Sequence, residues 1–137
     1  MSIEKIYSKI EPNKLISSIV SLKDVSSHRV DISPDDQFLQ VGVINLKDKT
    51  SIKAHKHKSI IRKTTITQEA WIIHRGKIKA SIYDIDKTFL KEIIITDGDC
   101  IVLYNGGHSF TSLEENTIFY EIKTGPYYRY ENDKEDI

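Results

Sequence analysis

The sequence predicts an all-β fold, and three of its features support this expectation. Isoleucine, valine, threonine and tyrosine dominate the middle of the chain, and these residues favour strands. Short apolar runs recur there at intervals of about 8–12 residues, as in sandwiches and barrels, and turn sequences such as Arg75-Gly76 separate them. From residue 38 onward, we find no long segment with the apolar spacing of an amphipathic helix.

The expected strands follow one another with short turns between them. Arg75-Gly76 and Asp97-Gly98-Asp99 are signals of tight turns, and Asp84-Ile85-Asp86-Lys87 is typical of a hairpin tip. Glycines and clusters of asparagine, aspartate and lysine punctuate the rest of the region. The expected strands cover residues 38–46, 51–57, 63–66, 69–74, 77–84, 91–95, 100–104, 109–113 and 117–123.

The first 35 residues have a different pattern. Four apolar residues that follow Pro12 fall on one side of a helix, and proline is tolerated in a first helical turn. We therefore expect a short helix in this region. The alternative is a strand that joins the edge of the barrel or is exchanged with a partner subunit. The four apolar residues are Leu15, Ile16, Ile19 and Val20.

A length of 137 residues corresponds to one domain, which at this size buries roughly two-thirds of the surface of its unfolded chain. We expect an N-terminal extension over residues 1–37, packed on the barrel or on a dimer partner. The barrel itself is expected over residues 38–126 and a C-terminal tail over 127–137. The aromatic start of the tail is expected to pack on the barrel and its charged end to fray.

Composition argues against several classes of function. The 20 basic and 20 acidic residues give a formal net charge of zero, which argues against a protein that binds nucleic acid or an anionic membrane. The single cysteine, Cys100, excludes an internal disulfide and a multi-cysteine zinc site. The sequence shows no recognisable secretion signal or membrane-spanning stretch, so we expect a soluble cytoplasmic protein.

His55-Lys56-His57 is the most informative motif in the chain. It ends a β-like run that begins at Ser51. Because successive side chains of a strand point to opposite faces, the two imidazoles share one face and lie about 7 Å apart along the strand. Neutral imidazole is the commonest metal ligand in proteins, so one interpretation is half of a metal site. The alternative is a solvated strand end, since lysines surround both histidines.

Glu69 and His108, which follow later in the chain, are candidate partners of the histidine pair. Glu69 opens an expected strand, on the face that also carries Trp71 and Ile73. A carboxylate on such an apolar face is costly unless it is paired or binds a cation; the alternative is a charge that stays solvated at the strand end. His108 follows a Gly-Gly bend, and paired glycines can turn the backbone back toward the mouth of a barrel.

These motifs resemble the two signature motifs of the cupin family over about residues 38–124. The first family motif places a glutamate and then a turn glycine after a His-x-His pair. The second places a histidine after a glycine, an apolar strand and a short turn. Eleven residues separate the His-x-His pair from the glutamate here, which implies an inserted loop or hairpin over residues 58–68. The matching residues are His55, His57, Glu69 and Gly76, and then Gly98, Gly106 and His108, with Tyr104 in the place of the motif proline.

The resemblance implies a double-stranded β-helix, the cupin jelly-roll barrel, with a metal ion inside near one mouth. One divalent ion of iron, manganese, nickel, cobalt or zinc would be held by three histidines and one glutamate. A closer similarity is to small, uncharacterised single-domain cupins that end in Glu-x-Lys-x-Gly-Pro-Tyr, here residues 121–127. Such proteins are often encoded among genes for surface polysaccharide synthesis, and dimers are common, so a homodimer is expected. The implied ligands are His55, His57, Glu69 and His108.

Other polar and aromatic residues are candidates for the surroundings of the metal. Glu121 stands on an otherwise apolar strand; it is a candidate general base or partner of a ligand histidine, or an outward charge paired with the next lysine. Lys53 and Arg62 are candidates for binding an anionic substrate, or solvated charges. Trp71 and Tyr104 are candidate walls of a substrate pocket, or core residues.

Together these features predict a metal-binding protein that acts on or binds a small polar molecule. A sugar or sugar-nucleotide derivative is the first expectation, from the genomic context of similar proteins. If the chain is an enzyme, we expect an isomerase, a dioxygenase or a hydrolase, because the fold does not choose among these reactions. The alternatives are a non-catalytic module that binds or senses a ligand and a metal-free sugar-nucleotide isomerase or epimerase.

Overall fold

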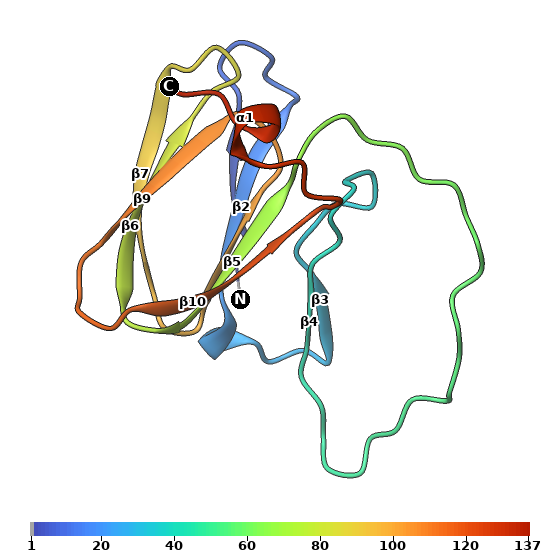
Figure 1. The fold of residues 1–137 in the computed structure, drawn as a ribbon. Coiled ribbons are helices and arrows are strands. Elements are labelled where there is room, and N and C mark those ends of the chain that lie inside the picture. The colour runs from blue at the N-terminus through green and yellow to red at the C-terminus, as the bar shows by residue number, and fades with distance from the viewer. Residues whose placement is uncertain (1) are drawn as a thin grey trace.

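The computed structural model describes residues 2–137, apart from the side chain of Asp24, and shows an all-β chain. Two antiparallel sheets face each other, and a small third sheet lies outside them (Figure 1). The largest sheet has five strands in the order β1-β2-β8-β5-β10. These strands are β1 (Glu4–Tyr7), β2 (Leu15–Ser21), β5 (Glu69–Arg75), β8 (Asp99–Leu103) and β10 (Ile118–Lys123).

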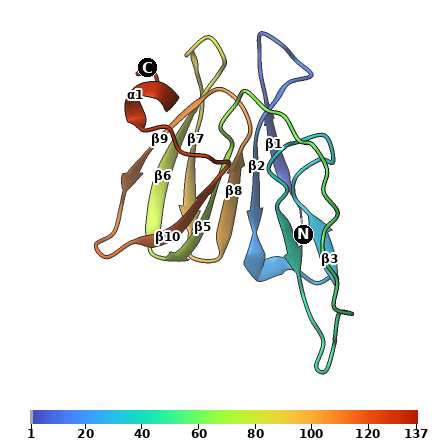
Figure 2. The same cartoon turned by 45° about the vertical axis from the view of Figure 1, so that its right-hand side comes forward.

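The facing sheet has three strands in the order β7-β6-β9, and the small sheet pairs β3 with β4. Figure 2 shows a short C-terminal helix, α1, at one end of the facing sheets. No helix in residues 2–137 is long and apolar enough to cross a membrane. The remaining elements are η1, a 3₁₀ helix (Leu22–Asp24), β3 (Arg29–Asp31), β4 (Gly42–Ile44), β6 (Lys77–Tyr83), β7 (Phe89–Thr96), β9 (Gly107–Ser112) and α1 (Tyr130–Asp133).

The main core fills the space between the two facing sheets. Ile78, Ala80 and Ile82 alternate along β6, and all three are fully buried in this core. They pack in one cluster with Trp71 and Ile73 of β5. Burying each large apolar side chain stabilises the fold by roughly 1.5–3 kcal/mol. This alternation therefore fixes which face of each strand points inward.

A second apolar cluster lies on the other face of the five-stranded sheet, where β3 and β4 cover it. Ala70, Val102 and Cys100 belong to this cluster. Burial raises the pKa of the Cys100 thiol to about 12, so Cys100 packs as a small apolar side chain and is not a reactive nucleophile. Tyr104 also lies in the cluster, and its hydroxyl lies 3.2 Å from Ser33 Oγ. The central strands of the large sheet are thus buried on both faces.

Two glycines allow the chain to cross between the facing sheets. Gly76 joins β5 to β6 with φ +95°, and a Cβ at this position would lie 2.8 Å from Thr117 Cα. Gly106 precedes β9 with φ +71°, and a Cβ there would collide with the carbonyl oxygen of Tyr83. The left-handed conformation and the close approach both disfavour a larger residue. These turns place β5 and β9 on opposite sides of the same interior.

The N-terminal segment forms strands, so the expected short helix over residues 15–20 is wrong. β2 pairs with β1 and with β8, and Ile19 lies opposite Ile101. The alternative of a strand is confirmed, although β2 lies inside the sheet and it is β1 that forms the edge. The helix-like spacing arose because β2 is buried on both faces and the positions between its apolar pairs hold two small residues, Ser17 and Ser18, both fully buried.

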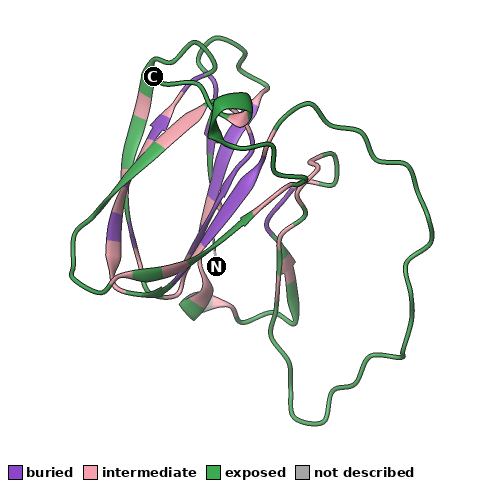
Figure 3. Cartoon of the chain, viewed as in Figure 1, coloured by how far each residue is buried: buried purple, intermediate pink, exposed green. Residues whose placement is uncertain are grey.

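Residues 46–66 form a long exposed segment, and the strands expected over 51–57 and 63–66 are absent from it. Every residue of the segment is exposed, as its green colour in Figure 3 shows. Among the described residues, its hydrogen bonds join only residues within the segment. The strand expected over 38–46 is likewise present only as β4. Without buried apolar contacts, these residues gain too little to offset the entropy of ordering.

Candidate functional site

Glu69 and His108 form the centre of the candidate site. Glu69 is the first residue of β5 and His108 the second residue of β9, so they come from the two facing sheets. Oε2 of Glu69 lies 3.3 Å from Nε2 of His108. Nε1 of Trp71 donates a hydrogen bond of 3.2 Å to the same carboxylate oxygen. The structure thus brings together two of the four ligands that the motifs imply.

β10 adds a lysine and a second carboxylate beside this pair. Its antiparallel register places Lys123 opposite Glu69 and Glu121 opposite Trp71. Nζ of Lys123 lies 3.8 Å from Oε1 of Glu69 and 2.7 Å from Oε1 of Glu121. Glu121 therefore has the lysine partner that one interpretation of the sequence expected. Lys123 links both carboxylates. Its contact with Glu69 was not expected from the sequence, because it depends on the pairing of β10 with β5.

The surroundings of Glu69 favour its ionised form. The side chain is buried, and burial alone would raise the pKa of the carboxyl group. The hydrogen bond and charge of His108, followed by the charge of Lys123 and the hydrogen bond from Trp71, outweigh burial and lower this pKa. The hydrogen bond to Glu121 raises the pKa of Lys123, which keeps the lysine charged. The site therefore contains a buried, ionised carboxylate that is suited to a cation.

Trp71 fixes the position of Glu69 relative to His108. Its ring centroid lies 5.2 Å from that of His108 and 5.3 Å from that of Phe110, both edge-to-face. Phe119 packs against it at 5.8 Å. Aromatic pairs favour such geometries. Because Trp71 contacts Glu69 through its N–H and His108 through its ring, it acts as the shared support of both side chains.

A cavity of about 790 Å³ lies beside the pair. Its lining includes Glu69, Trp71, His108 and Glu121 from the sheets, and residues 133–137 from the C-terminal segment. This volume is within the range of small-molecule sites. Trp71 is thus both a core residue and part of a pocket wall. The sequence carries no signal for the role of residues 133–137, because a charged tail does not indicate where it folds.

His55 and His57 lie outside this cavity, in the exposed 46–66 segment. Their ring centroids are 5.4 Å apart, so the two imidazoles are close to each other. Within residues 2–137, no group of three or more histidine, cysteine, aspartate or glutamate side chains is placed to hold a metal ion. The four implied ligands therefore form two separate pairs. Each pair has donor atoms that suit a divalent metal, but they do not converge on one point.

Three other candidate residues also lie away from the cavity. Lys53 and Arg62 belong to the exposed 46–66 segment. Tyr104 is fully buried in the second apolar cluster, on the face of the large sheet that points away from the main core. Tyr104 faces away from the cavity because it is two residues after Val102 and four after Cys100, so strand alternation puts all three on the same face. For Tyr104, the core interpretation describes its position.

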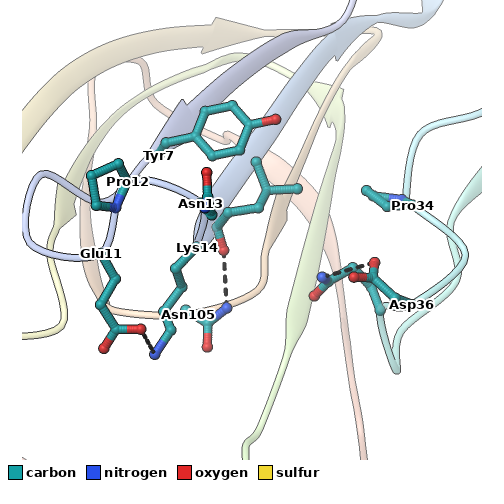
Figure 4. A pocket seen from close by; sticks show the side chains of 10 residues that line it. Tyr7, Glu11, Pro12, Asn13, Lys14, Pro34, Asp36 and Asn105 are labelled. Atoms are coloured by element: carbon teal, nitrogen blue, oxygen red, sulfur yellow. Dashed lines mark hydrogen bonds and ion pairs between the residues drawn. The ribbon is translucent and has the colours of Figure 1, made fainter.

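A second hollow of about 640 Å³ lies between the β1–β2 turn and the turn after β3 (Figure 4). Its polar side chains largely satisfy one another or the backbone. Lys14 pairs with Glu11 at 2.8 Å, and Nδ2 of Asn105 donates to the carbonyl oxygen of Leu15 at 2.9 Å. None of the candidate site residues from the sequence lines this hollow, so the Glu69–His108 cavity is the stronger candidate.

Comparison with known proteins does not identify a family. No family model, curated protein or solved structure matches this chain. The cupin resemblance is therefore carried by the sequence motifs, and the candidate site is assigned from its geometry.

Proposed function

We propose that this chain binds one divalent metal ion and a small polar molecule in the cavity beside Glu69 and His108. The contact between these two residues carries the proposal. They are far apart in the sequence and come from different sheets, yet their oxygen and nitrogen atoms lie 3.3 Å apart. Neighbouring ligands of an ion with bonds of about 2.1 Å have a similar separation of about 3–3.5 Å.

The histidine pair can reach this site by strand addition. β9 pairs with β6, and no other described strand pairs with β9. Such a free edge offers unpaired backbone donors and acceptors to an extended segment. Residues 51–57 have the alternation of a strand, so docking on β9 would put His55 and His57 on one face beside His108. We propose that the two facing sheets are those of a jelly-roll barrel, which the added strand would complete.

Charge complementarity supports this docking. Residues 49–68 contain six basic residues and no acidic residue. The cavity, in contrast, is lined mainly by carboxylates among its charged groups. Attraction between these regions would guide the segment toward the cavity. The lining carboxylates are Glu69, Glu121, Asp133, Glu135 and Asp136.

The chain's own residues prepare the site for a cation. Glu69 is ionised, and Trp71 holds its carboxylate through a hydrogen bond in the way that outer partners orient metal ligands. A bound metal ion would polarise an oxygen of the ligand as a Lewis acid. Lys123 and Glu121 lie beside it as a charged pair that can bind hydroxyl groups. A sugar or sugar-nucleotide derivative is the ligand class that we propose, and it rests only on the polysaccharide-synthesis context of the proteins that this sequence resembles.

The direct contact of Glu69 with His108 also supports a second candidate, a metal-free isomerase or epimerase. A carboxylate that orients an imidazole can help it to move a proton to or from a substrate. In this case the 46–66 segment would have no part in the chemistry. Loss of activity in a His108→Ala variant but not in a His57→Ala variant would favour this candidate.

Metal titration tests the main proposal. Purified apo protein would be titrated with Mn²⁺, Ni²⁺ and Zn²⁺ in a calorimeter, together with His57→Ala, His108→Ala and the control His74→Ala. His74 is an exposed histidine at the far end of β5. We expect one ion per chain in the wild type and the control, and a loss of affinity of about tenfold or more in both site variants.

Either of two results would contradict the proposal. Binding of none of the three metals would exclude the metal site, and unchanged affinity in His57→Ala would exclude the histidine pair as ligands. Incubation of the metal-loaded protein with nucleotide sugars then separates the roles. Product that disappears in His108→Ala indicates an enzyme, whereas a thermal shift without product indicates a binding module.

A further inference from the structure

The C-terminal segment, residues 129–137, lies across the Glu69–His108 cavity. After β10 the chain turns back, forms α1 and ends near the β6–β7 hairpin, as two views show (Figures 1 and 2). Five consecutive residues of the segment, 133–137, line the cavity. The segment is therefore a wall of the cavity, although its last residues were expected to fray.

Side-chain contacts fasten this segment at both sides of the cavity. On one side, Oγ1 of Thr67 donates a hydrogen bond of 2.6 Å to Oδ1 of Asp133. On the other, Nζ of Lys87 donates to Oε1 of Glu135 at 2.8 Å and to the carbonyl oxygen of Asp136 at 3.1 Å. Thr67 precedes β5 and Lys87 lies in the β6–β7 turn, so the contacts join the two facing sheets.

The end of the chain sits against the backbone next to His108. A Cβ added to Gly107 would collide with Cδ1 of Ile137. The segment is also stiffened internally, because the Tyr130 hydroxyl donates to Oδ1 of Asp136 at 2.5 Å. Apart from Asp133, which is half-buried, all of its residues are exposed. A segment held by a few polar contacts and little buried apolar surface opens more readily than the sheets beneath it.

We propose that residues 129–137 are a strap that closes the Glu69–His108 cavity and swings aside to admit the ligand. The proposal rests on this cavity being the ligand site, but it does not depend on a metal ion. The strap also sets the charge at the entrance, because Asp133, Glu135 and Asp136 line the cavity together with Glu69 and Glu121. In the closed position it therefore hinders anions more than neutral molecules.

Fluorescence quenching of Trp71 tests the strap without knowledge of the ligand. Trp71 is the only tryptophan in the chain and it lines the cavity. Acrylamide, a neutral quencher, would be added to the metal-free wild-type protein and to two variants. Lys87→Met removes the contact of the segment with the β6–β7 turn, and Gly107→Ala displaces Ile137. The control, Lys79→Met, removes a comparable exposed ion pair with Glu92 at 3.3 Å.

We expect the Stern–Volmer constant for acrylamide to rise about twofold or more in Lys87→Met and Gly107→Ala, and to stay unchanged in the control. Equal constants in all four proteins would overturn the strap. An equal rise in the control would also overturn it, because loss of any surface ion pair would then loosen the barrel. In the wild type, added NaCl should increase acrylamide quenching by screening the Lys87–Glu135 pair; no increase contradicts the proposal even if a variant fails to fold.

Iodide, an anionic quencher of tryptophan fluorescence, tests the effect of the strap's negative charge. Asp133→Asn removes a charge while its side-chain oxygen can still accept the hydrogen bond from Thr67. We expect iodide quenching of Trp71 to rise and acrylamide quenching to stay unchanged. Unchanged iodide quenching would contradict the electrostatic part of the proposal. Because no metal is present, failure of these tests is distinct from failure of the metal titration.

Discussion

The two pairs of implied metal ligands differ in what holds them. Glu69 lies on β5 and His108 on β9, and each strand is hydrogen-bonded within its own one of the two facing sheets. Trp71 contacts both side chains. His55 and His57 lie in the exposed 46–66 segment, whose described hydrogen bonds are all local. Both pairs consist of side chains that can bind a divalent metal, so their donor atoms do not explain why one pair is held and the other is not. The difference lies in the apolar packing around them. A ligand pair is fixed only where neighbouring residues bury enough surface to order the backbone.

The sequence of each region explains this difference. β5 carries Ala70, Trp71, Ile72 and Ile73 in succession, and their side chains fill the cores on both faces of the sheet. Residues 51–57 contain only two apolar residues among lysines, histidines and a serine. They have the alternation of a strand but little apolar surface to bury. An additional partner, such as the free edge of β9 together with a metal ion, would be needed to order them.

The largest expected contrast is between two isoleucines. Ile73 in β5 is 1 % exposed, whereas Ile61 in the 46–66 segment is 85 % exposed. Ile73→Ala should lower the free energy of unfolding by about 2–5 kcal/mol, because it leaves a cavity in the main core. Ile61→Ala should change it by less than about 0.5 kcal/mol. Urea unfolding followed by Trp71 fluorescence measures both.

Similar losses in the two variants would show that the 46–66 segment is packed in solution. That result would contradict the division of the molecule into a packed region and an exposed one. Repeating the measurement with metal sharpens the comparison. If residues 51–57 dock as a strand when metal binds, the cost of Ile52→Ala should rise in the metal-loaded protein and stay small in the apo protein, because isoleucine favours strands.

A smaller effect is expected at Asp84, which fastens the packed region near the strap. It is 1 % exposed and accepts hydrogen bonds from the backbone N–H groups of Lys9 at 2.7 Å and Ile85 at 2.8 Å. Burial opposes its ionisation, but hydrogen bonds from Ser8 and from these backbone groups outweigh burial and lower its pKa. Asp84→Asn should therefore lower the free energy of unfolding at neutral pH by about 1–3 kcal/mol.

The pH dependence of Asp84→Asn follows from the direction of the pKa shift. A lowered folded-state pKa means that the charged carboxylate stabilises the fold above the unfolded-state pKa. This contribution disappears as the pH falls through the folded-state pKa. The difference between wild type and variant should consequently shrink in acid. A difference that is constant from neutral pH to strongly acidic pH would contradict the role of the charged carboxylate.

Much of the fold was predictable because local patterns and turns agree. The expected strands over 69–74, 77–84, 100–104 and 117–123 coincide with β5, β6, β8 and β10 to within one residue at each end. Alternation along these strands and the turn glycines at Gly76 and Gly98 are strong local signals. β2 was predicted as a helix because a strand that is buried on both faces loses the alternation that identifies it.

The candidate site was predictable only in part. The sequence singles out Glu69 because six residues separate it from the turn glycine Gly76, and His108 because it follows the Gly106-Gly107 bend. The structure brings these two residues into contact. Strand composition also predicted order over 51–57, but order depends on tertiary burial that local sequence does not contain. The strap was missed for a related reason. Its fastening by Thr67 and Lys87 joins residues far apart in the chain, and no local pattern encodes such contacts.

The central claim is that Glu69 and His108 are the anchored half of a metal site that His55 and His57 complete. Hydrogen exchange of the backbone amides, with and without Mn²⁺ or whichever metal binds best, tests it most directly. We predict that the metal slows exchange in residues 51–57 and in β9 together, and that His108→Ala removes both effects. Metal-dependent protection that is absent from residues 51–57, or that persists unchanged in His108→Ala, would contradict the claim.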